Sequence, residues 1–398
     1  MAEALPIVVV GAGIAGLTTA LALSRRGRAV LIVERAGRLD EVGAGIQLSP
    51  NASRILVELD LFDGLAASGV EPTGVVIRSA SNGSVIAQLP LRETMLARYG
   101  APFLVIHRGD LQAALVAAAL RDPGITLHLG ATVSGARETA GAIVVAVSTP
   151  SGESEIEADA LVGADGVRSA VRTGLLGGPQ AAYSGRIAWR ATFPIDDGGG
   201  LDLTRKSGLW LGEKAHLVHY PIRGGRAVNV VAALDEPWTE DVWDVPGDPA
   251  AVAQAFATWP APARDLIGLP DRWRKWALCA VPDAGSWASG RIALVGDAAH
   301  AMLPFVAQGG AMAIEDAAVL ARLMSEGDRP MPQRLAEYER IRRPRATAVA
   351  ATARRNAAVY HLAGLAAMGR DIGLRALGPR RLLERMDWIY GWRDDEPK

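Results

Sequence analysis

Two side chains in one short segment, His216 and Tyr220, are of the types needed to remove a proton from a hydroxyl group. The segment is typical of a β-strand, in which these two residues project from the same face. An imidazole has an ordinary pKa of about 6.5, and a tyrosine hydroxyl can hold or relay the same proton. The pair therefore indicates acid–base chemistry, although two polar side chains on a solvated sheet face would give the same pattern.

A second concentration of special-purpose residues begins at Gly296 and reads GDAAHAMLPFVAQGGAMAIED. It holds an acid at Asp297, a kinked apolar run with Pro304, a glycine pair at Gly309 and Gly310, and then an acidic helical segment. This composition predicts a segment against which a flavin ring packs, and we call Gly296–Asp316 the flavin-bed stretch. Three further side chains of the stretch are predicted to face the substrate: Met302, Phe305 and Gln308.

The motif GAGIAG, from Gly11 to Gly16, follows a short apolar run and precedes a helical pattern. Gly11 permits a tight turn, Gly13 lets a pyrophosphate approach the backbone, and Gly16 lets the helix lie close to the strand. Glu34, at the end of the next strand, can accept hydrogen bonds from both ribose hydroxyls. The combination predicts an adenine dinucleotide site for FAD or NAD. The alternative is a glycine-rich turn in an unrelated α/β domain.

Other segments favour FAD as that dinucleotide. A small-residue loop with Gly45 and Gln47 provides the close backbone path that an isoalloxazine ring needs. Arg108 could reach a cofactor phosphate or ring edge, or could be a surface arginine beside a helix. The pair Asp165-Gly166 ends a further apolar strand. Asp165 could receive a ribose hydroxyl, or could only cap the helix that follows.

The elements that position these residues follow two patterns. Short apolar strands alternate with helices around the glycine-rich motifs, which predicts a Rossmann-like domain with a parallel sheet. Strand follows strand over residues 183–233, which predicts an antiparallel sheet in a substrate domain. The strand period places Arg186 and Arg190 on one face of that sheet, and one of them could anchor an anionic substrate.

The sequence therefore predicts an α/β chain in three parts. The expected ranges are 1–71, 92–182 and 285–331 for a discontinuous FAD-binding domain, 72–91 and 183–284 for a substrate-binding antiparallel sheet domain, and 332–398 for C-terminal helices. Asn51 and Asp110 are predicted as helix N-caps. Pro344 is predicted to break the long C-terminal helical pattern.

Composition excludes several classes of protein. The 42 basic and 43 acidic residues nearly balance, which gives no electrostatic reason to expect nucleic acid or an anionic membrane as partner. The single cysteine, Cys279, rules out a disulfide framework or a cysteine-based metal site, and no metal is predicted. No segment resembles a signal peptide or reaches the ~18 apolar residues of a membrane span. We therefore expect a cytoplasmic protein without membrane insertion.

Three stretches together resemble a known family. In order and spacing, GAGIAG with Glu34, GADGVRS around Asp165, and the stretch from Gly296 resemble the three fingerprints of the single-component (group A) flavoprotein aromatic hydroxylases. The resemblance covers nearly the whole chain. It is strongest to the branch with salicylate hydroxylase, 3-hydroxybenzoate 6-hydroxylase and 6-hydroxynicotinate 3-monooxygenase.

The resemblance also implies roles for individual residues. The first fingerprint binds the ADP part of FAD, the second touches both FAD and NAD(P)H, and the third places Asp297 on the ribityl chain. The implied cofactor-binding residues are Gly11, Gly13, Ala15, Gly16, Glu34, Arg35, Gly45, Gln47, Arg108, Val133, Asp165, Gly166, Asp297, Pro304, Gly309 and Gly310. The implied catalytic residues are His216 and Tyr220, which help to deprotonate or orient a substrate phenol, and Gln308, which lies near the substrate.

The implied function is FAD-dependent hydroxylation of a phenolic or hydroxylated heteroaromatic substrate, with a carboxylated one expected, using NADH or NADPH and O2 through a flavin C4a-hydroperoxide. One alternative is a flavin-dependent epoxidase or an antibiotic or polyketide hydroxylase, which would not need the His216 and Tyr220 pair. Another is a non-catalytic binding protein on the same fold, which would not need a complete FAD site. The choice of substrate, of NADH or NADPH, and of monomer or homodimer stays open.

Overall fold

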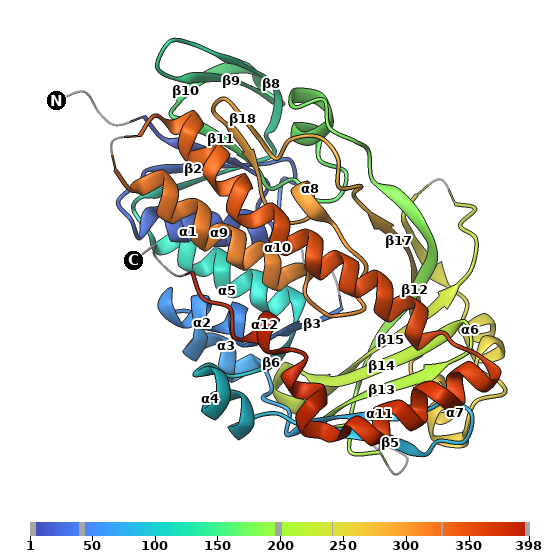
Figure 1. The fold of residues 1–398 in the computed structure, drawn as a ribbon. Coiled ribbons are helices and arrows are strands. Elements are labelled where there is room, and N and C mark those ends of the chain that lie inside the picture. The colour runs from blue at the N-terminus through green and yellow to red at the C-terminus, as the bar shows by residue number, and fades with distance from the viewer. Residues whose placement is uncertain (1–4, 40–43, 196–200, 241, 328, 395–398) are drawn as a thin grey trace.

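The computed structural model describes residues 5–39, 44–195, 201–240, 242–327 and 329–394. Two large β-sheets dominate it, and the long helix α10 (Met331–Tyr360) runs past both (Figure 1). One sheet is mainly parallel and the other mainly antiparallel. The predicted α/β class, with a parallel-sheet FAD-binding part, an antiparallel sheet and C-terminal helices, is confirmed. The predicted domain boundaries stay predictions.

The parallel sheet carries the glycine-rich motifs. Its strand order is β18-β19-β11-β1-β2-β7, in which only β18 runs antiparallel to its neighbour. The inner strands are short apolar runs buried on both faces, as the sequence predicts. The strands are β1 (Ile7–Val10), β2 (Val30–Glu34), β7 (Ile125–Leu129), β11 (Ala160–Gly163), β18 (Ala288–Ser289) and β19 (Ile292–Leu294).

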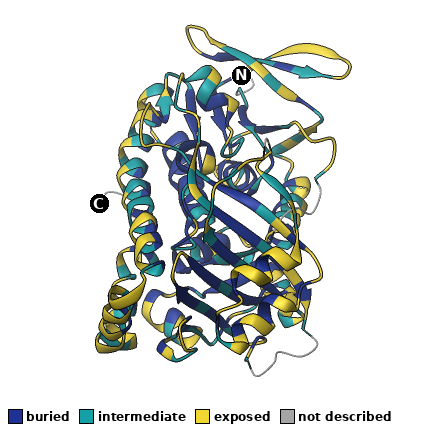
Figure 2. Cartoon of the chain, turned by 90° about the vertical axis from the view of Figure 1, so that its right-hand side faces the viewer, coloured by how far each residue is buried: buried dark blue, intermediate teal, exposed yellow. Residues whose placement is uncertain are grey.

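Different layers cover the two faces of this sheet. The helices α1 (Ile14–Ser24), α5 (Arg108–Arg121) and α9 (Gly309–Ser325) share one apolar core with it. On the other face lies a three-stranded antiparallel sheet, whose inward residues alternate along β9 and whose outer surface is largely exposed (Figure 2). Its strands are β8 (Thr132–Glu138), β9 (Ile143–Thr149) and β10 (Gly152–Ala158).

The second large sheet has eight strands in the order β16-β17-β12-β15-β14-β13-β4-β5. All neighbours are antiparallel except β13 and β4. The hairpin β4–β5 therefore joins the sheet through β13, which begins more than a hundred residues later in the chain. The strands are β4 (Gly74–Ser79), β5 (Val85–Pro90), β12 (Ala182–Pro194), β13 (Lys206–Gly212), β14 (Ala215–Ile222), β15 (Ala227–Asp235), β16 (Asp244–Gly247) and β17 (Trp273–Ala280).

The register of this sheet sets the positions of the predicted catalytic side chains. His216 on β14 pairs with Ala233 on β15, which pairs with Ala188 on β12. Tyr220, four residues further along β14, pairs with Asn229 on β15. Because paired residues share a face, the predicted alternation of β14 holds, and small side chains flank His216.

Several shorter elements accompany the two large sheets. They are β3 (Gly45–Leu48), which pairs with β6 (Leu104–His107), and α2 (Pro50–Glu58), α3 (Phe62–Ser68), α4 (Glu93–Tyr99), α6 (Pro249–Ala255), α7 (Ala261–Gly268), α8 (Asp297–His300), the π-turn η1 (Val171–Leu175) and the 3₁₀ turn η2 (Arg223–Gly225). Two predicted N-caps are wrong. Ser49 precedes α2, because Asn51 is turned into a buried hydrogen-bond network, and the His107 side chain caps α5 in place of Asp110.

The C-terminal helices correct another prediction. The helix α10 continues through Pro344, and α11 (Gly364–Glu384) and α12 (Asp387–Tyr390) follow. Pro344 is exposed, so the carbonyl group that loses its helical partner can bind water. Buried residues on the opposite side, from Tyr338 to Ala357, hold the helix straight against its neighbours. In the part of the chain that the structure describes, no helix has the length and apolar character needed to cross a bilayer.

A buried ion cluster joins α9 to α10. Arg342 donates to Glu315 Oε2 at 2.7 Å and to Asp316 Oδ1 at 2.8 Å, and all three side chains are fully buried. Arg345 donates two further hydrogen bonds to Glu315. Burial opposes the charge of Asp316, but His300 and Arg342 outweigh this effect and lower its pKa to about 2. The cluster thus fixes the helix that follows the flavin-bed stretch.

Substitution of Arg342 by Met should therefore strongly destabilise the protein. It leaves two buried carboxylates without their shared partner, and we expect a loss of roughly 3–5 kcal/mol in the free energy of unfolding. Urea unfolding followed by tryptophan fluorescence measures this loss. The control is Arg340→Ala on the same helix, whose pair with Glu337 is exposed and should leave the unfolding midpoint unchanged. Equal midpoints for the two variants would contradict a stabilising role for the cluster.

Candidate functional site

The first fingerprint is built on two close backbone approaches. Gly11 has φ +104°, and an added Cβ would lie 2.7 Å from the Ala164 carbonyl oxygen. A Cβ on Gly16 would lie 1.9 Å from the Gly11 carbonyl oxygen. Around Gly13, by contrast, no atom of the described residues outside its own chain neighbours and helix backbone lies within 4 Å of an added Cβ. The turn is therefore closed on the protein side and open at Gly13, as the approach of a pyrophosphate requires.

Glu34 lies beside this turn as predicted. Its Oε2 accepts a hydrogen bond from the Ala12 N–H at 2.7 Å, and its Oε1 accepts one from the Ala36 N–H at 2.8 Å. These bonds fix the carboxylate at the end of β2 and leave lone pairs free on both oxygens. The geometry suits a carboxylate that accepts hydrogen bonds from ribose hydroxyls.

The second fingerprint meets the first through the contact of Ala164 with Gly11. Asp165 Oδ2 accepts from the N–H groups of Ala170 and Val171, at 2.7 and 3.1 Å. The predicted capping role is therefore present, although the element that follows is the π-turn η1. Asp165 Oδ1 is buried and has no hydrogen-bond partner among the described residues. Because a buried carboxylate oxygen needs a donor, this atom fits a ligand hydroxyl.

The third fingerprint also packs on the first. An added Cβ on Gly296 would lie 3.0 Å from the Cβ atoms of Ala15 and Ala313. The Gly296 N–H donates to Asp316 Oδ2 at 2.9 Å. Asp297 then begins α8 with its side chain exposed. The three predicted motifs, far apart in sequence, thus converge on Gly11–Gly16.

The loop before α2 lies between the large sheet and α9. Gly45 donates its N–H to Asn229 Oδ1 at 2.7 Å, and an added Cβ on Gly45 would lie 2.4 Å from the Tyr220 ring. On the other side, a Cβ on Gly310 would lie 2.6 Å from Ile46. The Tyr220 ring leaves no room for a side chain at Gly45, whereas a Cβ on Gly310 would meet only the end of the flexible Ile46 side chain. The antiparallel sheet thus faces the start of α9 across this loop.

The remaining predicted cofactor residues differ in exposure. Arg35, Arg108 and Pro304 are exposed, while Gly166, Gln47 and Gly309 are half-buried. Arg108 begins α5, and its N–H donates to the Ala44 carbonyl at 2.9 Å. Val133 lies on β8, partly buried against the core under the three-stranded sheet. The contacts of these residues with FAD stay predictions.

His216 is buried in an aromatic environment. Its ring lies edge-on to Phe305 at 4.9 Å and to Tyr360 at 5.5 Å between centroids, which brings the third fingerprint to the sheet face. Burial, followed by His361 and Arg186, lowers the pKa of His216 well below its ordinary value. The ring is therefore neutral at neutral pH, and its Nε2 has no hydrogen-bond partner among the described residues.

No sequence pattern predicts that His361 and Asp235 lie beside His216. His216 Nδ1 lies 2.9 Å from His361 Nε2, and His361 Nδ1 lies 3.0 Å from Asp235 Oδ1. His361 directly follows α10, 145 residues from His216. No local pattern links residues so far apart, and only the paired register of β14 and β15 could have placed Asp235 near this end of the strand.

Tyr220 lies at a different place from His216. Four residues along a strand span about 13 Å, and Tyr220 packs on Gly45 in another apolar cluster. Burial raises the pKa of Tyr220, partly offset by Arg190. The two side chains share a face as predicted. The expectation that they hold the same proton stays a prediction.

Gln308 is engaged by protein groups on both ends of its amide. Its Nε2 donates to Ser49 Oγ at 2.8 Å, and its Oε1 accepts from Asn51 at 3.0 Å. Asn51 also donates to Glu315 at 2.7 Å. The side chain thus ties the start of α9 to α2. The predicted role of Gln308 near the substrate stays a prediction, and it would compete with these bonds.

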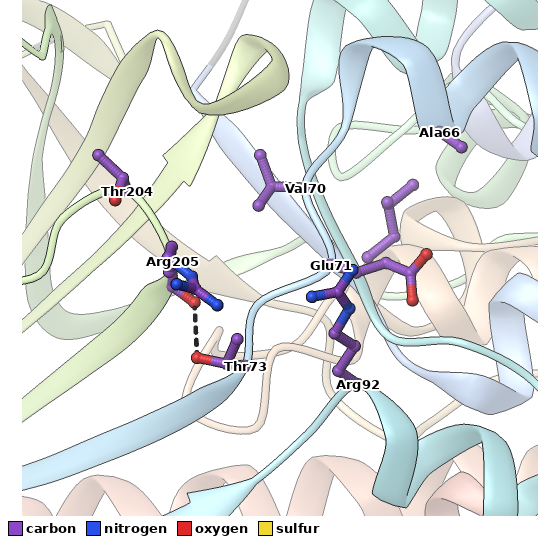
Figure 3. A pocket seen from close by; sticks show the side chains of 8 residues that line it. Ala66, Val70, Glu71, Thr73, Arg92, Thr204 and Arg205 are labelled. Atoms are coloured by element: carbon purple, nitrogen blue, oxygen red, sulfur yellow. Dashed lines mark hydrogen bonds between the residues drawn. The ribbon is translucent and has the colours of Figure 1, made fainter.

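A cavity of about 290 Å³ lies elsewhere, between α3, β6 and the segment before β13 (Figure 3). Its polar lining includes Glu71, Thr73, Arg92 and Arg205, and the Thr73 hydroxyl donates to the Arg205 carbonyl. None of the predicted cofactor or catalytic residues lines it. We therefore place the candidate site where the three motifs converge and not in this cavity.

The residues present fit an FAD molecule. An open glycine turn, a fixed carboxylate at its side and the unpartnered Asp165 Oδ1 supply the contacts that a dinucleotide needs. The sequence matches the family described as FAD binding domain over residues 4–187 and 262–353. The chain belongs to this family.

Relatives of this chain are named as hydroxylases and monooxygenases of aromatic acids. The chain is 33% identical over 388 residues to 3-hydroxybenzoate 6-hydroxylase of Polaromonas naphthalenivorans, covering 98% of this chain and 96% of the relative. It is 36% identical over 388 residues to 3-amino-4-hydroxybenzoate 2-monooxygenase of Streptomyces platensis, covering 97% and 96%. A solved salicylate hydroxylase substrate complex matches with a TM-score of 0.83 at 25% identity, covering 99% and 97%.

These findings confirm the predicted family, its FAD cofactor, and the enzyme class of NAD(P)H-dependent flavoprotein monooxygenases of the aromatic hydroxylase type. Among the residues that the structure describes, no cluster of His, Cys, Asp or Glu could hold a metal ion.

Replacement of Glu34 by Gln should weaken FAD binding roughly 10- to 100-fold, because a charge-assisted hydrogen bond contributes about 1.5–3 kcal/mol. Titration of the apoprotein with FAD, followed by flavin fluorescence, gives the dissociation constant. Glu153→Gln, on the exposed edge strand β10, is the matched control. An unchanged dissociation constant for Glu34→Gln would remove Glu34 from the cofactor site.

Proposed function

We propose that this enzyme hydroxylates a phenolic carboxylic acid of the hydroxybenzoate class, with His216 as the base that removes the phenol proton. The observation that carries the proposal is His216 itself. It is a buried, neutral imidazole on the sheet face that meets Phe305 of the third fingerprint, and its Nε2 has no hydrogen-bond partner among the described residues. The named substrates of the relatives, hydroxybenzoate and aminohydroxybenzoate, support this class.

The chemistry requires such a base. When bound, FAD reduced by NAD(P)H activates O2 as an electrophile, and an aromatic ring attacks an electrophile far better as a phenolate than as a phenol. A neutral imidazole near the phenol oxygen can accept the proton at Nε2. His216 satisfies this need, because burial and nearby positive charge keep it unprotonated.

Arg190 is the residue we assign to the substrate carboxylate. Arg190 is half-buried, its Nε is buried without a hydrogen-bond partner, and no carboxylate pairs with it among the described residues. Ala188 on β12 is in register with His216 through Ala233 on β15. Arg190 lies two positions along β12 from Ala188, so it projects from the same face of the sheet as His216. A partly buried cation without a counter-charge is unfavourable, so an anionic substrate group would stabilise it. Arg186 is less suited, because Asp235 already balances its charge.

Two further features support a water-poor site over the flavin bed. Phe305 is 3% exposed and lies between His216 and Arg186, whose guanidinium is 5.9 Å from the ring centroid. Gly309 and Gly310 begin the 17-residue helix α9, whose N-terminal N–H groups and dipole favour negative charge. The protein would thus exclude water and stabilise charge where the flavin ring lies.

A flavin-dependent epoxidase or an antibiotic or polyketide hydroxylase remains the alternative, and it would have no need of a base at His216. A cytoplasmic location, where NAD(P)H is available, belongs to the proposal, as does a small aromatic molecule as the partner.

The test is turnover of 3-hydroxybenzoate by wild type and His216→Ala. Wild type should oxidise NADH or NADPH and release a dihydroxybenzoate, and His216→Ala should lower kcat by roughly 10²- to 10⁴-fold, the usual contribution of a general base. Because only neutral His216 accepts a proton and its pKa is lowered, wild-type kcat/KM should fall only below pH 6.5. Product formation by liquid chromatography gives both quantities.

His128→Ala, on the exposed end of β7, is the control and should keep wild-type turnover. Salicylate and 4-hydroxybenzoate extend the substrate class, while phenol and benzoate lack one of the two groups and should be turned over poorly. Full turnover by His216→Ala would exclude His216 as the base. Rapid oxidation of a non-phenolic alkene, with no turnover of any phenolic acid, would favour the epoxidase.

A further inference from the structure

A line of three polar side chains connects His216 to the protein surface. His216 Nδ1 lies 2.9 Å from His361 Nε2, and His361 Nδ1 lies 3.0 Å from Asp235 Oδ1. Both histidines are at most 8% exposed, whereas the Asp235 side chain is 33% exposed. The line therefore runs from the buried candidate base to a carboxylate in contact with solvent.

The carboxylate at one end determines the hydrogens of both rings. An ionised carboxylate only accepts hydrogen bonds, so neutral His361 must carry its hydrogen on Nδ1 and donate it to Asp235. His361 Nε2 is then an acceptor, and His216 must donate to it from Nδ1. His216 Nε2 is thereby left with a lone pair. This is the tautomer that can accept a proton from a substrate.

The backbone holds the three residues in place. Asp235 ends β15, and its N–H donates to the Lys214 carbonyl at 3.0 Å, one residue before β14 begins. Lys214 in turn donates its N–H to the His361 carbonyl at 3.3 Å. The C-terminal end of α10 is thus tied to the same strand turn that positions His216.

The surrounding charges disfavour a lasting positive charge on His216. The groups that face the line are Arg186 from β12, Tyr360 from the end of α10, and Arg370 from α11 beside His361. Arg186 Nε lies 2.8 Å from Asp235 Oδ1 and balances that carboxylate. In the part of the chain that the structure describes, no carboxylate contacts His216 directly. A proton that His216 accepts is therefore poorly held and needs a way out.

We propose that Asp235 and His361 are positioning residues that hold His216 in its proton-accepting tautomer and conduct the proton it accepts to solvent. The inference rests on the proposed function, since it assumes that His216 accepts the phenol proton.

The proton movements balance. The substrate O–H bond breaks as an N–H bond forms at His216 Nε2, and the His216 Nδ1 hydrogen passes to His361 Nε2. The His361 Nδ1 hydrogen passes to Asp235, which releases a proton to water. When the product oxygen regains its proton from His216 Nε2, the same movements run in reverse and restore the starting tautomers.

The test is the tautomer of each ring in the FAD-loaded enzyme without substrate. Nitrogen-15 NMR of histidine-labelled protein distinguishes protonated from unprotonated ring nitrogens, and the six histidines can be assigned by single substitutions. Wild type should show hydrogen on Nδ1 of both His216 and His361. In Asp235→Asn the amide can donate to His361 Nδ1, so both rings should invert and place the hydrogen of His216 on Nε2.

Turnover of 3-hydroxybenzoate supplies the second readout. Asp235→Asn should lower kcat at least 10-fold with little change in KM, since it alters the base and not the binding groups. Asp235→Glu, which keeps an accepting carboxylate, should recover most of that loss. Asp244→Asn, at a surface pair with Arg274, is the control for both readouts. If Asp235→Asn does not fold, His361→Phe serves instead, and His216 should no longer be fixed with hydrogen on Nδ1.

Different results would overturn the relay and the proposed function. A His216 tautomer that is the same in wild type, Asp235→Asn and His361→Phe would overturn the relay, whatever the enzyme turns over. A wild type with the expected tautomers that hydroxylates no phenolic acid would overturn the proposed function instead.

Discussion

The buried ion pairs of Arg342 with Glu315 and Asp316 are the interaction on which the rest of the structure depends. These two acids lie at the middle of α9, and each has a second task. Asp316 accepts the N–H of Gly296, which fixes the turn into the third fingerprint, and Glu315 accepts from Asn51 on α2. Because a buried carboxylate tolerates few alternative partners, this one cluster positions the flavin-bed stretch relative to α10 and α2.

That constraint extends to the reaction site. With α9 and α10 locked together, the segment between α8 and α9 carries Phe305 to the antiparallel sheet, and the end of α10 carries His361 to the same place. His216 thus lies where the cofactor part, the sheet and the C-terminal helices meet. The position of His216, the proposed base, therefore depends on these two packing elements as well as on its own strand.

The sequence was most informative where the function of a residue is local. The spacing of Gly11, Gly13 and Gly16 and the register of Glu34 predict the turn that the structure contains, because strand, turn and helix are contiguous. The prediction failed where distant contacts compete with local preference. A buried network overrides the capping tendency of Asn51, and solvent on one side with packing on the other lets α10 continue through Pro344. The partners of His216 were not predictable, since no period connects them.

We propose that this enzyme inserts one atom of O2 into a phenolic acid that is deprotonated at His216. The most direct test is turnover of 3-hydroxybenzoate under ¹⁸O2, with mass spectrometry of the product. The expected product is a dihydroxybenzoate that carries one ¹⁸O atom for each NAD(P)H consumed. An unlabelled product, or NAD(P)H oxidation that yields only hydrogen peroxide with every phenolic acid, would contradict it.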